Sequence, residues 1–171
     1  MNEQAICILC EKNAEKAHIP GKVGYFIKCD ICGEYFFASP EIFESSYRTL
    51  PREKRAMISS YTRDCFEHRK EPPQLEDAGY LKGIITEYEN KTVNDRVKHL
   101  IMYIRKKSPQ FGYNVLLEAD KDYPITYSMN PEGFTEIINN AIEQGLVKSI
   151  ESGFELTEQG YTLGTELLEI E

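Results

Sequence analysis

The sequence lacks the long hydrophobic runs of membrane and exported proteins. No stretch approaches the roughly 18 uninterrupted apolar residues of a membrane-spanning helix. The first ten residues have no basic start, apolar stretch or small-residue cleavage site of a secretory signal. We therefore expect a cytoplasmic protein that does not enter a membrane. Reducing conditions there make paired cysteines metal ligands more often than disulfides.

Positive charge is scarce in the C-terminal third. After residue 110 only Lys121 and Lys148 stand against 12 Asp and Glu, whereas residues 1–110 contain 18 Lys and Arg and 16 Asp and Glu. An acidic segment repels a phosphate backbone, and a mildly basic one tolerates or attracts it. The 171 residues, 41% of them hydrophobic, suffice for one large domain or two small ones with ordinary cores.

Four of the five cysteines fall into two pairs. Cys7 and Cys10 form the first, Cys29 and Cys32 the second, and 18 residues separate the pairs, a spacing typical of four-cysteine zinc sites. Two intervening residues let consecutive thiolates turn onto one ion, and Gly33 can supply the positive backbone angle of such a turn. Four thiolates fill the tetrahedron, so we predict one structural Zn²⁺ that performs no catalysis.

The residues around these pairs predict a short β-structure. We expect strands at 17–19 and 25–28, joined by a turn, and a third at 35–37. Together with the cysteine spacing this resembles a zinc ribbon, which we assign to residues 1–39. In so small a core, metal binding of about 10 to 16 kcal/mol would supply most of the folding free energy. The alternatives are a metal-free pair of dithiols, or His18 replacing one cysteine.

Residues 40–90 are predicted to form a helical connector. Pro51 opens a helix that reaches Lys70 and buries Met57, Ile58, Tyr61 and Cys65. Its other face is the most concentrated basic surface in the sequence and a candidate nucleic-acid contact, although a solvated face interleaved with acidic residues is the alternative. The basic set consists of Arg48, Arg52, Lys54, Arg55, Arg63, Arg69 and Lys70.

The rest of the connector offers no catalytic constellation. Cys65 and His68 are three residues apart, as a nucleophile and a base can be, but no orienting group or oxyanion site accompanies them. We interpret Cys65 as a packed thiol and expect no enzyme activity. Pro72 and Pro73 end the helix, so we predict a linker at 71–77 and a second helix at 78–89.

Residues 91–171 alternate helices and short strands. Thr92 and Asp95 predict a capping box that opens the first helix, and a short strand is expected at 113–118. Asn130 predicts the start of a second helix, which Gly145 ends.

A hairpin is then expected at 146–156, and Thr157 is expected to cap a last helix. This order and the Leu156-Thr157-x-x-Gly160 turn resemble a winged helix-turn-helix domain over 91–171. The resemblance implies a DNA-binding fold with the helix at 130–144 in the recognition position. However, that helix carries three glutamates, Glu132, Glu136 and Glu143, and no Lys or Arg, so the phosphate contacts of groove docking are missing. We therefore expect this surface to bind protein.

The chain as a whole is predicted to be α+β, with ribbon, helical connector and winged helix in that order. This combination, with the segment from Lys54 to Tyr61, resembles N-terminal modules of bacterial anti-phage-defence proteins, in which a TIR-like or deoxyribosyltransferase-like effector follows. No effector follows in this sequence, so its activity is not carried over. We expect a zinc-binding adaptor or sensor with a protein partner. The alternative is a nucleic-acid-binding transcriptional regulator that uses the ribbon and the basic helix face at 48–70.

Overall fold

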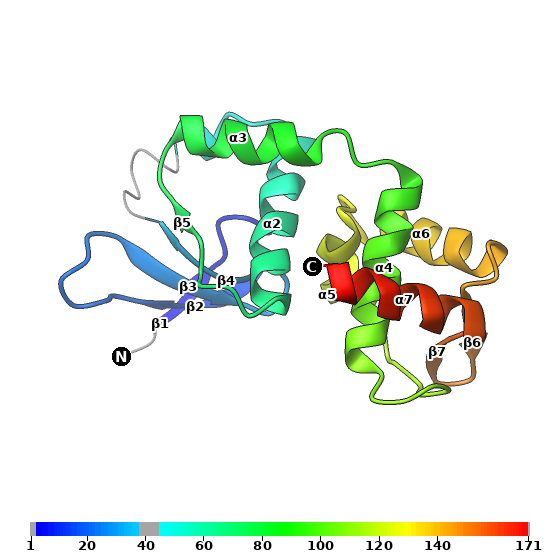
Figure 1. The fold of residues 1–171 in the computed structure, drawn as a ribbon. Coiled ribbons are helices and arrows are strands. Elements are labelled where there is room, and N and C mark those ends of the chain that lie inside the picture. Colours follow the sequence, from blue (N-terminus) through cyan, green and yellow to red (C-terminus); the bar gives the residue numbers. More distant parts are fainter. Residues whose placement is uncertain (1–2, 38–44, 171) are drawn as a thin grey trace. The chain divides into compact units, whose positions relative to one another are not determined.

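The computed structural model describes residues 3–37 and 45–170. The chain is α+β and divides into two compact units, Met1–Asn90 and Lys91–Glu171 (Figure 1). The last two residues of the predicted ribbon, 38 and 39, lie outside the described part. None of the described helices is long and apolar enough to cross a bilayer.

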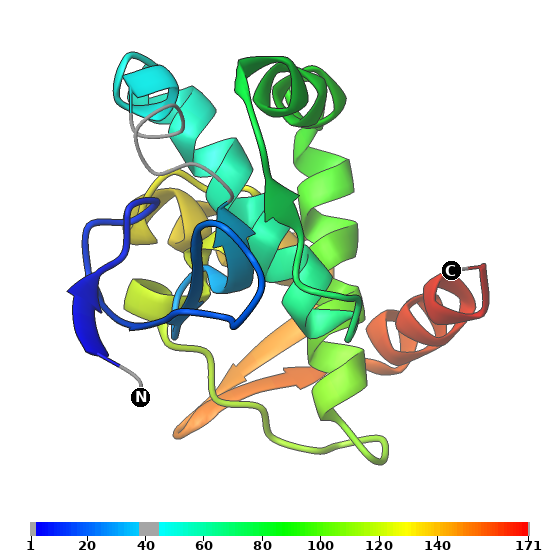
Figure 2. The ribbon, with the colours of Figure 1, turned by 90° about the vertical axis from the view of Figure 1, so that its left-hand side faces the viewer.

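The N-terminal unit contains a five-stranded sheet with its strands in sequence order, and Figure 2 gives a second view of this unit. The strands β1 (Glu3–Ile6), β2 (Asn13–Ala17), β3 (Tyr25–Cys29) and β4 (Gly33–Phe37) are antiparallel. The predicted third strand is confirmed as part of β4. The strand expected at 17–19 was placed too late, because β2 ends at Ala17 and pairs with β3 through Glu15, Lys16 and Ala17.

Besides the helical residues 45–48, the described part of this unit contains two further helices. Both predicted helices are present as α2 (Arg52–Glu67), which packs on β4, and α3 (Ala78–Tyr88), which packs on α2. The first ends three residues before the predicted Lys70. The predicted linker at 71–77 was wrong, because it contains β5 (Gln74–Leu75), which pairs in parallel with β4. Leu75 is fully buried opposite Phe37, and the carbonyl of Pro73 accepts the Phe36 N–H at 2.9 Å. The helix ends at Glu67, before both prolines, so the prediction that Pro72 and Pro73 end it was wrong. Pro73 instead precedes the edge strand β5, a position that suits a residue without an N–H donor.

The C-terminal unit surrounds the long helix α4 (Val93–Lys107). The capping box predicted at its start is confirmed, since Thr92 and Asp95 bond each other's backbone N–H groups. The other elements are α5 (Ala119–Asp122), the 3₁₀ helix η1 (Tyr123–Thr126), α6 (Pro131–Glu143), β6 (Val147–Ile150), β7 (Gly153–Leu156) and α7 (Glu158–Ile170).

The later predictions for this unit are confirmed with one exception. Asn130 caps α6, β6 and β7 form the hairpin, and Thr157 caps α7. The strand expected at 113–118 was wrong in extent, because its Val115 pairs with Phe154 as an isolated bridge. The core lies between α4, α6 and the hairpin, with α7 packed along α4 (Figure 1). Its most deeply buried side chains include Leu100, Ile101, Ile104, Phe134 and Leu156.

Candidate metal centre

The four paired cysteines converge on one point of the N-terminal unit. Cys7 follows β1, Cys29 ends β3, and Cys10 and Cys32 lie in the turns after them. All four sulfurs lie within 4.8 Å of one another, with Cys7 Sγ 3.7 Å from Cys32 Sγ and Cys10 Sγ 3.5 Å from Cys29 Sγ. Zinc–sulfur bonds of about 2.3 Å give a tetrahedron with edges of about 3.8 Å. The thiols are free, and their spacing fits a metal ion such as Zn²⁺.

Each turn is built to direct its cysteines inward. In the first, the Cys7 N–H donates to the Lys12 carbonyl at 2.7 Å, and Glu11 adopts a left-handed φ of 61°. In the second, Gly33 has a φ of 77°, and the Cys32 N–H points at Cys29 Sγ at 3.5 Å. A Cβ at Gly33 would lie 2.5 Å from the Phe66 Cβ, so this position requires glycine for conformation and for space.

Side chains from outside the pairs contact the sulfurs. The Tyr35 hydroxyl lies 3.2 Å from Cys7 Sγ, and the Ser59 hydroxyl lies 3.0 Å from Cys32 Sγ. Cys7 and Cys32 are fully buried, whereas Cys10 is partly exposed. The sequence reasoning missed these hydroxyl contacts. No sequence signal singles out Ser59, because its polar neighbours Ser60 and Thr62 in α2 are also buried.

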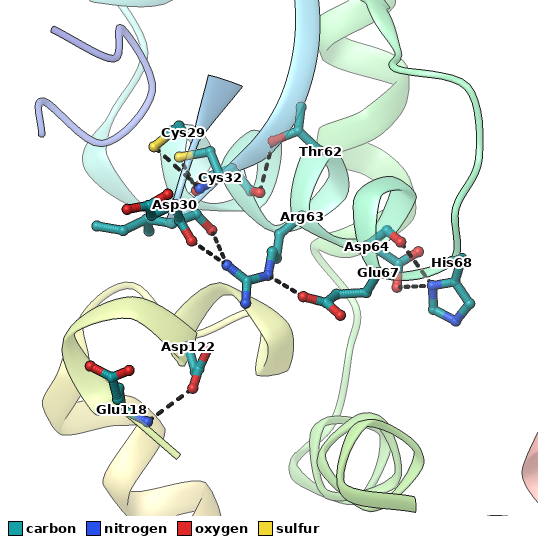
Figure 3. A network of polar contacts seen from close by, with 12 residues as sticks. Cys29, Asp30, Cys32, Thr62, Arg63, Asp64, Glu67, His68, Glu118 and Asp122 are labelled. Atoms are coloured by element: carbon teal, nitrogen blue, oxygen red, sulfur yellow. Dashed lines mark hydrogen bonds and ion pairs between the residues drawn. The ribbon is translucent and has the colours of Figure 1, made fainter. Parts of the chain in front are cut away.

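Arg63 of α2 holds the second turn (Figure 3). Its Nη1 donates to the carbonyls of Asp30 and Ile31 at 2.5 and 3.1 Å, and its Nε lies 2.9 Å from the Glu67 carboxylate. The Arg63 side chain is only 7% exposed. In the first turn, Tyr47 plays a similar part, since its hydroxyl donates to the Leu9 carbonyl at 2.8 Å. Both turns are therefore fixed by residues beyond the predicted ribbon.

The thiols differ in acidity because their surroundings differ. Burial raises the pKa of Cys32, whereas the hydrogen bond from the Cys10 thiol lowers the pKa of Cys29. Four neighbouring thiolates repel one another, so a bound cation is needed to keep all of them ionised. A metal ion bound here would therefore release protons from the thiols, and its binding would weaken as the pH falls.

The basic set predicted from the sequence does not form one surface. Arg63 is buried at the metal centre, Arg55 pairs with Glu11 at 3.3 Å and Lys54 pairs with Glu89 at 3.1 Å. The exposed residues of the basic set lie at the two ends of α2 or just outside them. This helix has 16 residues and is therefore about 24 Å long. The exposed residues are Arg48 and Arg52 at its start, and Arg69 and Lys70 after its end.

The other candidate residues have local partners. Burial raises the pKa of Cys65, which is the opposite of what activates a nucleophilic thiol. His68 Nδ1 lies 2.8 Å from the Asp64 carbonyl and 3.3 Å from its carboxylate. His18 is exposed on the ribbon and packs edge-on against Tyr25, so it is outside the cysteine cluster.

Comparisons with protein-family models, curated proteins and solved structures found no match for this chain. Within residues 3–37 and 45–170, the cysteine cluster is the one group of three or more His, Cys, Asp or Glu side chains that could hold a metal ion. The geometry therefore supports a metal-binding module, and zinc is the ion that four thiolates favour.

Proposed function

We propose that the chain is a non-enzymatic zinc-binding interaction module. The observation that carries this proposal is the closed arrangement of four cysteine sulfurs within 4.8 Å of one another. Four thiolates leave no coordination position for water or substrate, which is the property of a structural site. The buried, weakly acidic thiol of Cys65 adds support for a role without covalent catalysis.

Metal analysis of the purified chain tests the zinc component. We expect one zinc per chain, and we expect Cys29→Ser to lose it. Cys65→Ser is the matched control, because Cys65 is also buried but belongs to α2 and not to the cluster. Substantially less than one zinc per folded wild-type chain would contradict the proposal, as would retention of full zinc by Cys29→Ser.

The C-terminal unit is proposed to be a winged helix that binds a protein with a basic surface. The bridge between Val115 and Phe154 places Val115 beside β7, on the side away from β6. This order, with the hairpin outermost, is compatible with the three-stranded sheet of a winged helix. The exposed side of α6 carries Glu132, Glu136 and Glu143, which repel nucleic-acid phosphates and favour a cationic partner. We propose an adaptor or sensor role in bacterial defence or regulation for this pair of units.

A matched pair of charge variants tests the partner surface. Neutralising the α6 glutamates should weaken capture of a basic partner from the source cells, because the attraction depends on their charge. The control removes the same charge from α7 and should leave capture unchanged. Equal effects of both variants would show that α6 is not the partner surface. The test variant changes Glu132, Glu136 and Glu143 to Gln, and the control changes the exposed Glu158, Glu166 and Glu169.

Nucleic-acid binding through the N-terminal unit is the second candidate, and the exposed cations at the two ends of α2 favour it. It predicts an affinity for DNA or RNA that falls steeply with salt. Changing Arg52, Arg69 and Lys70 to Glu should abolish that binding without touching the metal centre, whereas changing Arg63 would damage the fold. Binding that survives the triple change would exclude these cations as the contact surface.

A further inference from the structure

The two most deeply buried sulfurs of the metal centre are the two beside hydroxyl groups. Cys7 and Cys32 are both 0% exposed, and their neighbours are Tyr35 and Ser59 at 3.2 and 3.0 Å. In a metal-free site either atom of each pair can donate the hydrogen bond. A metal-bound thiolate has no proton, so in the loaded site the hydroxyl must be the donor.

The loaded site has a charge that these donors can offset. Four thiolates and one Zn²⁺ carry a net charge of −2 in a largely buried position. Charged groups in such a position are stabilised by hydrogen bonds, and bonds to ionised acceptors are stronger than neutral ones. A hydroxyl that donates to a thiolate also withdraws electron density from it and makes it less reactive toward protons and competing ligands.

We propose that Tyr35 and Ser59 are positioning residues of the zinc site, which slow the loss of metal by donating hydrogen bonds to Cys7 and Cys32. This inference rests on the proposed zinc binding. It also links the metal to α2, because Ser59 lies in that helix and Arg63, one turn further along, bonds the turn that carries Cys32. Bound metal fixes the acceptor of Ser59, so metal removal loosens α2 from the sheet.

Neighbouring serines allow a matched test. Ser60 is as buried as Ser59, at 0% against 2% exposed, but its hydroxyl donates to the Ala56 carbonyl of its own helix at 3.0 Å. Loss of an outer contact lowers metal affinity by about 10-fold or more. We expect this loss to appear as faster dissociation, so Ser59→Ala should transfer zinc to a chelator about 10-fold faster than wild type. Ser60→Ala should stay within about twofold of wild type.

Substitution with Co²⁺ supplies a readout that a purely structural role would not move. Loss of a hydrogen bond to a thiolate raises its electron density, so the sulfur-to-cobalt charge-transfer band should shift to longer wavelength in Ser59→Ala and in Tyr35→Phe. It should not shift in Ser60→Ala. A band and a transfer rate in Ser59→Ala that match those of Ser60→Ala would overturn the proposal.

A measurement on the wild-type chain covers the case in which the variants do not fold. Chelation of the metal should speed hydrogen exchange in α2 while leaving α4, in the other compact unit, unchanged. Unchanged protection of α2 would refute the link to the metal. If the wild-type chain binds neither Zn²⁺ nor Co²⁺, the proposed function itself fails. If the wild-type chain binds metal, but Ser59→Ala and Tyr35→Phe show its transfer rate and cobalt band, only the roles proposed for the two hydroxyl groups are refuted.

Discussion

Replacing Arg63 by alanine is expected to destabilise the N-terminal unit by about 3 to 5 kcal/mol, the range for removing one partner of a buried ion pair. Arg63 is 7% exposed at its side chain, and its partner Glu67 is 13% exposed. The substitution leaves the Glu67 carboxylate without its guanidinium in a poorly solvated position. It also removes the donors of two backbone carbonyls in the turn between Cys29 and Cys32.

The two carbonyl bonds give an independent estimate of the same size. Hydrogen bonds that involve a charged group contribute about 1.5 to 3 kcal/mol each, and they are not additive with the ion pair. Arg55→Ala is the control, since Arg55 also belongs to α2 but pairs with Glu11, which is 75% exposed. An ion pair of that kind contributes about 1 kcal/mol or less.

Urea unfolding of the zinc-loaded chain can measure both variants. The sequence has no tryptophan, so amide signals in NMR spectra are the better probe and report on each compact unit separately. We expect Arg63→Ala to lower the unfolding midpoint of the N-terminal unit and to leave that of residues 91–171 unchanged. If Arg63→Ala costs no more than Arg55→Ala, the structural role assigned to Arg63 is refuted.

Three further predictions concern a glycine in the first turn of α7, the cap of α4 and the metal. Gly160→Ala should destabilise the C-terminal unit by at least about 1 to 3 kcal/mol, because a Cβ would collide with the Leu146 carbonyl oxygen. The control is Gly83→Ala, where a Cβ meets open space, and thermal unfolding should show this variant to be as stable as wild type or more stable. Hydrogen bonds from Thr92 lower the pKa of Asp95 in the folded chain. The Asp95 carboxylate therefore stabilises the fold above the pKa of the unfolded carboxyl group, and this stabilisation is lost as the pH falls through the folded pKa. An NMR titration that finds an ordinary or raised pKa for Asp95 would contradict this. Removal of the metal by a chelator should unfold the sheet of the N-terminal unit, and circular dichroism should still show the helical signal of residues 91–171. Loss of the sheet and of that helical signal together would show that the two units do not fold independently.

Local rules explain why much of this fold is readable from sequence. The capping box of Thr92 and Asp95, the Asn130 cap and the turn at Thr157 each depend on residues within three positions of one another. Such contacts form wherever the local chain is helical, so their sequence patterns are reliable. The predictions failed where the paired residues are distant in sequence, as for β5, whose residues pair with β4 residues 38 positions earlier.

The basic helix face shows a second limit. Sequence spacing placed Arg63 with the exposed cations, because a charged residue is seldom buried. The structure buries it, since the carbonyls of Asp30 and Ile31 accept from its Nη1 and the carboxylate of Glu67 pairs with its Nε. No periodicity reveals an acceptor that lies 32 residues away in the chain.

The sequence alone therefore determined which four cysteines are the candidate metal ligands, because two Cys-x-x-Cys pairs can turn four thiolates onto one ion. Only the tertiary structure decided what surrounds those ligands. Tyr35, Ser59 and Arg63 reach the site because β4 and α2 pack beside it, and such contacts depend on the packing of elements distant in sequence.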